Sequence, residues 1–204
     1  QSKDTISHYK ELEKFLRDHF SVAEVAYQWS AQHYQSADNV PYIGLASRLA
    51  KHTYIAAGFF ADGLVYGTLA GIIIGDLILE NQNPLIDTYQ ANRFDPIAAA
   101  KFVAKENTNV FIQYVKGSSD VAKNYDDIKP GEGKVVKINH EKCAVSRDEN
   151  NKLHIVSAIC THMKCTVNWN TAEETWDCPC HGSRFTQCGK VIEGPAIADL
   201  ESKQ

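Results

Sequence analysis

The sequence predicts an α+β protein in which an α/β part comes first and an all-β domain follows. Three observations predict this order. Apolar residues recur at helical spacing near the N-terminus and again around residue 70, the stretch after residue 95 is rich in alanine, and the chain after residue 130 breaks into short strand-like runs separated by turn residues. We therefore expect three parts: residues 1–95, a helical linker at 96–129, and a β domain at 130–204.

The first part begins with a helix at residues 8–20, capped by Ser7, and continues with strand-like stretches at 22–30 and 51–57. A glycine-rich turn then leads into an apolar run at residues 64–79. This run has 16 residues and contains Asp76, whereas a membrane span needs about 20 apolar residues. The pattern therefore predicts a buried core helix and no transmembrane segment.

The β domain is expected to contain strands at residues 134–138, 143–147 and 153–158, followed by a hairpin of 166–169 and 175–177. The turns between them carry Asn, Asp and Gly. A domain of this size has a small core, so we expect a bound metal or a disulfide to supply part of its stability.

The composition is that of an ordinary globular chain of 204 residues, with 44% hydrophobic residues and a net charge of −4. Lys and Arg form no run, so we expect no nucleic-acid partner. The chain has no signal-peptide pattern and does not begin with methionine. We therefore expect it to be a fragment of a longer protein that is cytoplasmic or peripheral to a membrane.

Cysteine and histidine residues are concentrated in one short stretch. Four of the six cysteines and two of the eight histidines lie between Cys160 and Phe185. Their pattern is C-x-H, fifteen residues, C-x-x-H. In an extended loop Cys160 and His162 would face one site, and a tight turn after Cys178 would let His181 converge on it. Thiolate and neutral imidazole groups are metal ligands, so the sequence predicts a metal centre here.

A structural zinc site is one interpretation, because two cysteines and two histidines form a common zinc ligand set. Zinc modules, however, usually place cysteine with cysteine and histidine with histidine at short spacing. Here each pair mixes one cysteine with one histidine, which favours an iron–sulfur cluster.

The motif resembles the Rieske iron–sulfur family, in which two cysteines hold one iron of a [2Fe–2S] cluster and two histidines hold the other. The resemblance implies that the ligands are Cys160, His162, Cys178 and His181. It also implies a disulfide between Cys165 and Cys180, as in the cytochrome bc-type branch of the family. Cys143 and Cys188 lie outside this set, and we expect both to be reduced and incidental.

Further residues match positions that surround the cluster in this family. Ser183 matches a serine whose hydroxyl bonds a cluster sulfur, Met163 an apolar residue that covers the cluster, and Pro195 the proline loop. Phe185 stands where high-potential members have a tyrosine, which implies a lower potential here. Lys164 departs from the glycine that is usual before the second cysteine of the first loop.

A second set of short motifs lies in residues 1–95. In order they are Tyr27-x-Trp29-Ser30-Ala31-Gln32, Asp38-x-x-Pro41-Tyr42-Ile43-Gly44, Gly58-Phe59-x-x-x-Gly63, Asp76-Leu77-Ile78-Leu79, Asn83-Pro84 and Arg93-Phe94. Their order resembles the C-terminal end of a flavin-dependent amine or amino-acid oxidoreductase of the D-amino-acid-oxidase type. The resemblance implies flavin contacts at Gly58, Gly63, Leu64, Val65 and Thr68.

Two features depart from that flavin family. Asp62 would oppose a reduced anionic flavin, and the chain has no G-x-G-x-x-G dinucleotide fingerprint. We therefore expect FAD only in a longer protein. A structural role for residues 1–95 without any cofactor contact is the alternative.

Together the two resemblances predict an α/β fragment of a flavin oxidoreductase followed by an all-β Rieske domain. The expected function is single-electron transfer between flavin and an acceptor. The redox partner would be the flavin domain or a soluble electron carrier, and this part of the protein would itself catalyse no reaction. The alternatives are the Rieske subunit of a quinol–cytochrome complex and a non-catalytic module whose cluster senses redox state or stabilises the fold. A ring-hydroxylating oxygenase is disfavoured, because no mononuclear iron triad is evident.

Overall fold

The structure is a computed structural model that describes residues 5–93, 96–119, 121–122 and 124–203. The chain forms two compact units. Unit 1 holds residues 1–30 together with 108–204, and unit 2 holds residues 31–107. The domain boundaries expected near residues 95 and 130 remain a prediction.

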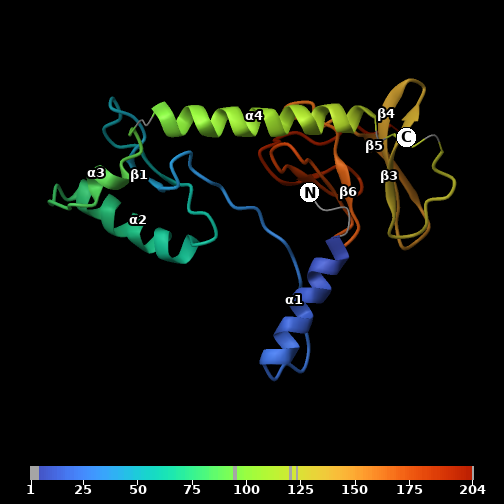
Figure 1. The fold of residues 1–204 in the computed structure, drawn as a ribbon, viewed down its shortest axis with the longest axis horizontal. Helices are drawn as coiled ribbons and strands as arrows, with labels where there is room; N and C mark the ends of the chain where they lie inside the picture. The colour runs from blue at the N-terminus through green and yellow to red at the C-terminus, as the bar shows by residue number, and fades with distance from the viewer. Residues whose placement is uncertain (1–4, 94–95, 120, 123, 204) are drawn as a thin grey trace. The chain divides into compact units, whose positions relative to one another are not determined.

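The helices agree in part with the sequence patterns (Figure 1). Their bounds are α1 Thr5–His19, α2 Gly63–Ile78, α3 Ile86–Tyr89 and α4 Pro96–Ser119. Ser7 lies inside α1, so the expected cap at this residue is wrong. The strand expected at residues 22–30 is also wrong, because this segment has no regular structure. The segment is held instead by hydrogen bonds to distant side chains.

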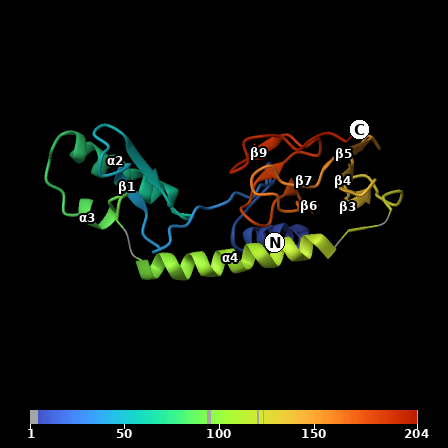
Figure 2. The same ribbon diagram turned by 90° about the horizontal axis from the view of Figure 1, so that it is seen from above.

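Two antiparallel sheets of unit 1 lie beside one another (Figure 2). The first holds β3 Gly133–Ile138, β4 Glu141–Arg147 and β5 Leu153–Ser157 in that order, and the second holds β6 Asn168–Asn170, β7 Thr175–Asp177, β8 Arg184–Phe185 and β9 Val191–Glu193. The strands expected in the β domain are therefore confirmed to within two residues.

The two sheets meet where β3 crosses β6. A Cβ atom added to Gly133 would lie 2.5 Å from the Trp169 ring, so only glycine fits at this position. Trp169 in turn lies edge-on to the fully buried Trp176, with ring centroids 4.8 Å apart. A core of twelve buried residues, which includes Cys160, Cys165, Cys178 and Cys180, extends from here to the loops after β5 and β7.

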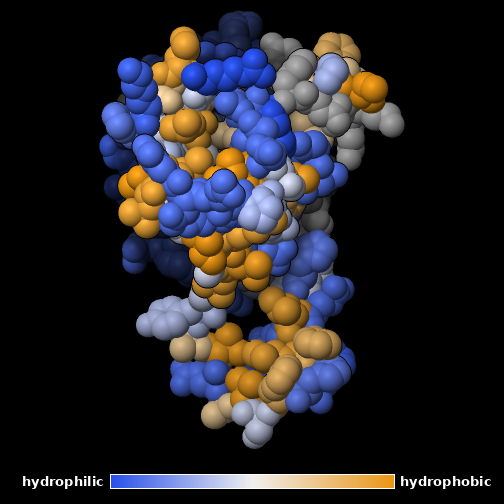
Figure 3. All heavy atoms as spheres, turned by 90° about the vertical axis from the view of Figure 1, so that its left-hand side faces the viewer, coloured by the Kyte–Doolittle hydropathy of each residue, from blue (hydrophilic) through white to orange (hydrophobic). Residues whose placement is uncertain are grey.

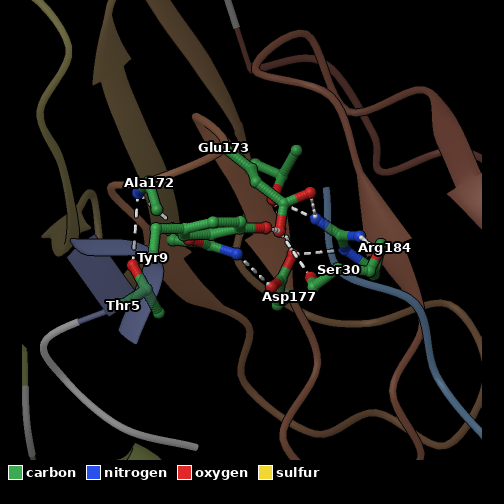
Figure 4. A network of polar contacts seen from close by, with 9 residues as sticks. Thr5, Tyr9, Ser30, Ala172, Glu173, Asp177 and Arg184 are labelled. Carbon is green, nitrogen blue, oxygen red and sulfur yellow. Dashed lines mark hydrogen bonds and ion pairs between the residues drawn. The ribbon is translucent and has the colours of Figure 1, made fainter. Parts of the chain in front are cut away.

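The N-terminal segment is attached to the second sheet of unit 1 through a partly buried polar network (Figure 4). The Tyr9 hydroxyl donates to Glu173 over 2.8 Å, and the Ser30 hydroxyl donates to the same carboxylate over 2.5 Å. Arg184 donates to Glu173 over 2.6 Å and to the backbone oxygen of Ser30 over 3.0 Å. Thr5 accepts from the backbone N–H of Ala172. Residues 5–30 are therefore attached at both ends to the turn between β6 and β7.

Unit 2 contains α2, α3, the first half of α4 and a hairpin of β1 Tyr42–Leu45 and β2 Tyr54–Ala57. Its buried core is small and is formed by Ile43, Ala70 and Ile73. Arg93 stabilises the entry to the hairpin, because its guanidinium donates to Asp38 at 2.7 and 2.9 Å and lies 4.2 Å from the centre of the Tyr42 ring.

The expectation that residues 64–79 form a buried helix is only half right. The helix is present as α2, but only Ala70 and Ile73 of it are buried, while Leu64 is 92% exposed and Val65 is 66% exposed. Hydrophobic residues gather in patches on the face of the molecule that Figure 3 draws. In the part of the chain that the structure describes, no helix is long and apolar enough to cross a membrane.

Candidate metal centre

The two loops that carry the expected ligands share one backbone pattern. In the first loop the N–H of Lys164 donates to the oxygen of Cys160, and the N–H of Cys160 donates to the oxygen of Cys165. In the second loop Gly182, Cys178 and Ser183 make the same two bonds at the same spacing. The first loop is therefore a tight turn, and the expectation that it is extended is wrong.

Both turns need a left-handed residue at the same place. This residue is Gly182 in the second loop, with φ of 81°, and Lys164 in the first, with φ of 61°. Glycine adopts this conformation without steric cost, whereas a residue with a Cβ atom pays about 1 kcal/mol. Lys164 therefore adopts the same backbone conformation as glycine would, but its Cβ atom makes that conformation strained.

The two expected sulfur ligands lie together in the core. Cys160 is 1% exposed and Cys178 is 3% exposed. The hydrogen bond with the Cys178 thiol lowers the pKa of Cys160 to about 5, and the same bond, together with burial, raises the pKa of Cys178. Two thiols that compete in this way for one negative charge become a pair of thiolates when a metal cation lies beside them.

The two expected imidazole ligands also lie together, nearer the surface. The ring centroids of His162 and His181 are 4.9 Å apart, and the rings are almost perpendicular. His162 is exposed and His181 is half-buried. The donor set is thus divided into a buried sulfur pair and a more accessible nitrogen pair, which suits a [2Fe–2S] centre with two thiolates on one iron and two imidazoles on the other.

The disulfide between Cys165 and Cys180 is confirmed and links the two loops. The sulfur atoms of Cys165, Cys178 and Cys180 lie within 4.8 Å of one another, which superficially resembles a three-cysteine metal site. Two of these sulfurs are bonded to each other and cannot act as thiolates. This trio is therefore the disulfide together with the Cys178 thiol, which also belongs to the Cys160/Cys178 pair.

Hydrogen bonds attach a third loop to the first two. Ser183 is fully buried, and its oxygen accepts from the N–H of Ala196 over 2.9 Å. A hydrogen bond from Ser183 also contributes to the low pKa of Cys160. The Thr161 hydroxyl donates to the oxygen of Ala198 over 2.6 Å. Ser183 therefore connects a candidate sulfur ligand with the loop that contains Pro195.

The other residues expected around the cluster lie in contrasting environments. Phe185 is fully buried in β8 and belongs to the same core as Cys160 and Cys178. Met163 is 59% exposed, and Pro195 is exposed in the third loop. Met163, directly after His162 in the first loop, therefore presents a large apolar side chain on the surface.

The residues expected to contact flavin lie in unit 2, around the start of α2. Gly58 has φ of 76° and follows β2, Gly63 begins the helix, and the Thr68 hydroxyl donates to the oxygen of Leu64. Asp62 is exposed and makes no side-chain cap to α2. Leu64 and Val65 extend from this end of the helix. Phe94, the last residue of the flavin-like motifs, lies outside the described residues.

Sequence reasoning missed the ionic group behind the second loop. Arg184 precedes Phe185 in β8, and its guanidinium contacts Asp177 at 3.3 Å as well as Glu173 at 2.6 Å. Burial alone would raise the pKa of Glu173, but hydrogen bonds from Ser30, Arg184 and Tyr9 outweigh it and lower the pKa. The one available signal was an arginine directly before Phe185 in the ligand motif.

Known proteins resemble this chain over different lengths. Residues 119–204 match the model of the Rieske [2Fe–2S] domain. The Rieske 2Fe-2S iron–sulfur protein YhfW of Bacillus subtilis is 36% identical over 202 residues, which is 98% of this chain and 40% of that protein. The cytochrome b6-f iron–sulfur subunit of Chlorobaculum tepidum is 45% identical over 37% of this chain and 41% of its own length. The chain thus spans less than half the length of these two relatives.

Among solved structures, the plasma membrane Rieske protein of Synechocystis PCC 6803 is 35% identical and covers 34% of this chain and 72% of its own, with a TM-score of 0.33.

Proposed function

We propose that this chain, whose residues 119–204 form a Rieske [2Fe–2S] domain, passes single electrons between a donor and an acceptor protein. The observation that carries the proposal is the division of the donor set. Cys160 and Cys178 are buried in the same core, while the rings of His162 and His181 lie together nearer the surface.

In this proposal the two thiolates and the two imidazoles hold the cluster. A [2Fe–2S] cluster supplies one-electron redox chemistry when it is bound. Cys160 and Cys178 anchor the buried side and exclude water from it. His162 and His181 form the accessible side, where a partner protein could approach. The Cys165–Cys180 disulfide restrains the two loops, and Ser183 donates to the Cys160 sulfur and so favours the state with more negative charge.

The test of the proposed function is the content and spectrum of the purified protein. We expect iron and acid-labile sulfide in equal amounts, visible absorption, and an electron paramagnetic resonance signal that appears only after one-electron reduction. Stoichiometric zinc in a colourless protein would support the zinc interpretation and overturn the proposal.

We further propose that the donor is a flavin bound in a longer protein of which this chain is part. Two observations support this. The chain spans 40% of the Bacillus relative, and α2 presents apolar side chains and the glycines 63, 67, 71 and 75 to open space. Such a helix suits close approach of a covering domain or cofactor.

Stopped-flow mixing of the longer protein with an amino acid or amine should reduce flavin first and the cluster second. Cluster reduction that never follows flavin reduction would contradict the flavin link.

A quinol donor is the second candidate, and the similarity to a cytochrome b6-f iron–sulfur subunit favours it. That similarity covers 37% of the chain, and the Rieske domain match at residues 119–204 leaves residues 31–107 without a role in this alternative. Mixing the protein with a reduced quinone analogue distinguishes the donors, since rapid cluster reduction by quinol would replace the flavin proposal with this one.

A further inference from the structure

Cys188 lies on the surface of unit 1 with a histidine and a carboxylate behind it. Its Sγ atom is 3.3 Å from Nδ1 of His154, and Nε2 of His154 is 2.8 Å from Oδ2 of Asp148. The three residues come from separate segments: the loop between β8 and β9, strand β5, and the turn between β4 and β5. Cys188, which the sequence alone marks as incidental, is thus the end of a Cys–His–Asp series.

The turn between β4 and β5 fixes the carboxylate. Oδ1 of Asp148 accepts from the backbone N–H of Asn150 at 3.0 Å and of Lys152 at 2.9 Å, which leaves Oδ2 for the imidazole. The hydrogen bond from His154 lowers the pKa of Asp148, so the carboxylate is charged at neutral pH. A charged acceptor at Nε2 places the imidazole proton there and leaves the Nδ1 lone pair for the Cys188 thiol.

A shallow pocket opens beside this thiol. Its volume is about 630 Å3, within the range of roughly 300–1,000 Å3 that is typical of small-molecule sites. The lining includes Asp148, His154, Glu173, Glu174, Gln187 and Cys188. Three of the ten lining residues are acidic. A small molecule that reacts at Cys188 would therefore meet a negatively charged wall.

We propose that Cys188 is a reactive thiol that exchanges with low-molecular-weight disulfides, with His154 as its base and Asp148 as the residue that positions the base. The thiol proton passes to Nδ1 of His154, and the thiolate attacks one sulfur of the disulfide. A bond forms between Cys188 and that sulfur while the original sulfur–sulfur bond breaks. The leaving thiolate takes the proton back from His154. Cys188 is oxidised to a mixed disulfide, and the leaving sulfur is reduced to a thiol.

The charge of the lining selects among disulfides. Asp148 and Glu174 favour a cationic disulfide over an anionic one, whereas the charge of Glu173 is already compensated by Arg184 at 2.6 Å. The disulfide of cysteamine, which carries two positive charges, should react faster than the disulfide of glutathione, which is anionic. Comparison of the two separates a selective site from a merely exposed thiol.

The other cysteines allow a clean measurement. Cys143, Cys160 and Cys178 are buried and Cys165 and Cys180 form a disulfide, so Cys188 is the one exposed free thiol among the six cysteines, all of which the structure describes. The cluster-loaded protein is mixed with the cysteamine disulfide at pH 7, and adduct formation is followed by intact mass. The Cys188→Ser variant should form no adduct.

The variants that test the base are His154→Gln and Asp148→Asn, with His140→Gln, on the turn between β3 and β4, as the matched control. We expect the rate of adduct formation to fall about tenfold in His154→Gln, severalfold in Asp148→Asn, and not at all in the control. Asparagine retains an oxygen for the turn, and unchanged absorption of the cluster shows that each variant is folded. Equal rates in all four proteins, or faster reaction with the glutathione disulfide, would overturn the proposal.

The dependence of the reaction rate on pH shows whether His154 acts as a base or only supports the structure around Cys188. The charged and titratable groups around Cys188 are His154 from β5, Asp148 from the turn before it, Glu173 and Glu174 from the turn between β6 and β7, and Lys190 from its own loop. As the pH is lowered, the rate of alkylation by iodoacetamide should fall later in the wild type than in His154→Gln. Identical pH profiles for the two proteins would contradict the role of His154. This site does not depend on the cluster, so a colourless protein would overturn the proposed function and leave the thiol proposal standing.

Discussion

At the scale of single residues, the two candidate ligand loops differ at one position, and the difference should be measurable in the free energy of unfolding. Lys164 and Gly182 occupy equivalent left-handed positions, yet only Gly182 does so without a Cβ atom. Lys164→Gly should therefore stabilise unit 1 by about 0.5–1 kcal/mol, measured by chemical denaturation. Lys164→Ala is the control, since it removes the charge and retains the Cβ atom. An equal gain in both variants would mean that charge, not backbone strain, is relieved.

Phe185 bears on the potential of the proposed cluster. It is fully buried in the same core as Cys160 and Cys178 and cannot donate a hydrogen bond. In Phe185→Tyr, a new hydroxyl that donates to a ligand sulfur would favour the reduced state by about 1 kcal/mol, or roughly 40 mV for one electron. Protein-film voltammetry should show the midpoint rising.

Ser183→Ala is the matching variant, which should change the midpoint potential in the opposite direction. It removes the hydroxyl that bonds Cys160 and leaves the N–H of Ala196 without that acceptor. We expect its midpoint to fall. A midpoint that moves in the same direction in Phe185→Tyr and Ser183→Ala would contradict hydrogen bonding to sulfur as the controlling factor.

At the scale of elements, the hairpin of unit 2 depends on one ion pair. The hydrogen bonds from Arg93 hold the pKa of Asp38 at about 2, below its ordinary value of 3.8. A carboxyl group with a lowered folded-state pKa contributes stability that is fully present above pH 4 and is lost as pH falls through 2. The helical signal of unit 2 should therefore become less stable to heat between pH 4 and pH 2.

Asp38→Asn isolates this contribution from that of other carboxyl groups. The variant should be less stable than the wild type at pH 5, because it lacks the ion pair, and the difference should shrink towards pH 2. A difference that is constant over this range, followed by circular dichroism, would show that Asp38 contributes through its shape and neutral hydrogen bonds alone.

At the scale of the whole molecule, the attachment of residues 5–30 to the β domain depends on Glu173, which accepts from Tyr9, Ser30 and Arg184. Glu173→Gln removes the charge that these groups share and should cost about 1–3 kcal/mol. Hydrogen exchange should then accelerate across α1 and the segment after it.

Glu24→Gln is the control for that experiment, because Glu24 is exposed in the same N-terminal segment. We expect its exchange rates to match those of the wild type. If Glu173→Gln and Glu24→Gln behave alike, the segment is held by contacts other than the Glu173 network.

The sequence predicted what depends on nearby residues. The spacing of cysteines and histidines indicated two short loops, and the turn residues between Arg147 and Leu153 indicated a hairpin, because each pattern lies within a few positions. The disulfide followed from the family resemblance. The attachment of Ser30 to Arg184 could not be predicted, since the two residues are 154 positions apart and leave no periodic signal. The contact between Cys188 and His154, which are 34 positions apart, could not be predicted for the same reason.

Exposure was harder to predict than secondary structure. The apolar pattern of α2 correctly indicated a helix, but a mainly apolar helix fits equally a buried core or a surface that another domain covers. Leu64 and Val65 are exposed in this chain, which spans 40% of its Bacillus relative. Burial is a property of the assembled protein, and periodicity alone does not determine it.

The most direct test of the account is spectroscopy of the reduced protein after incorporation of 15N-labelled histidine. If Cys160, Cys178, His162 and His181 hold the cluster, electron–nuclear double resonance should show two histidine nitrogens coupled to the unpaired electron. The variants His162→Ala and His181→Ala should each remove one coupling. A paramagnetic cluster without histidine couplings, or a protein that binds no iron, would contradict the central claim.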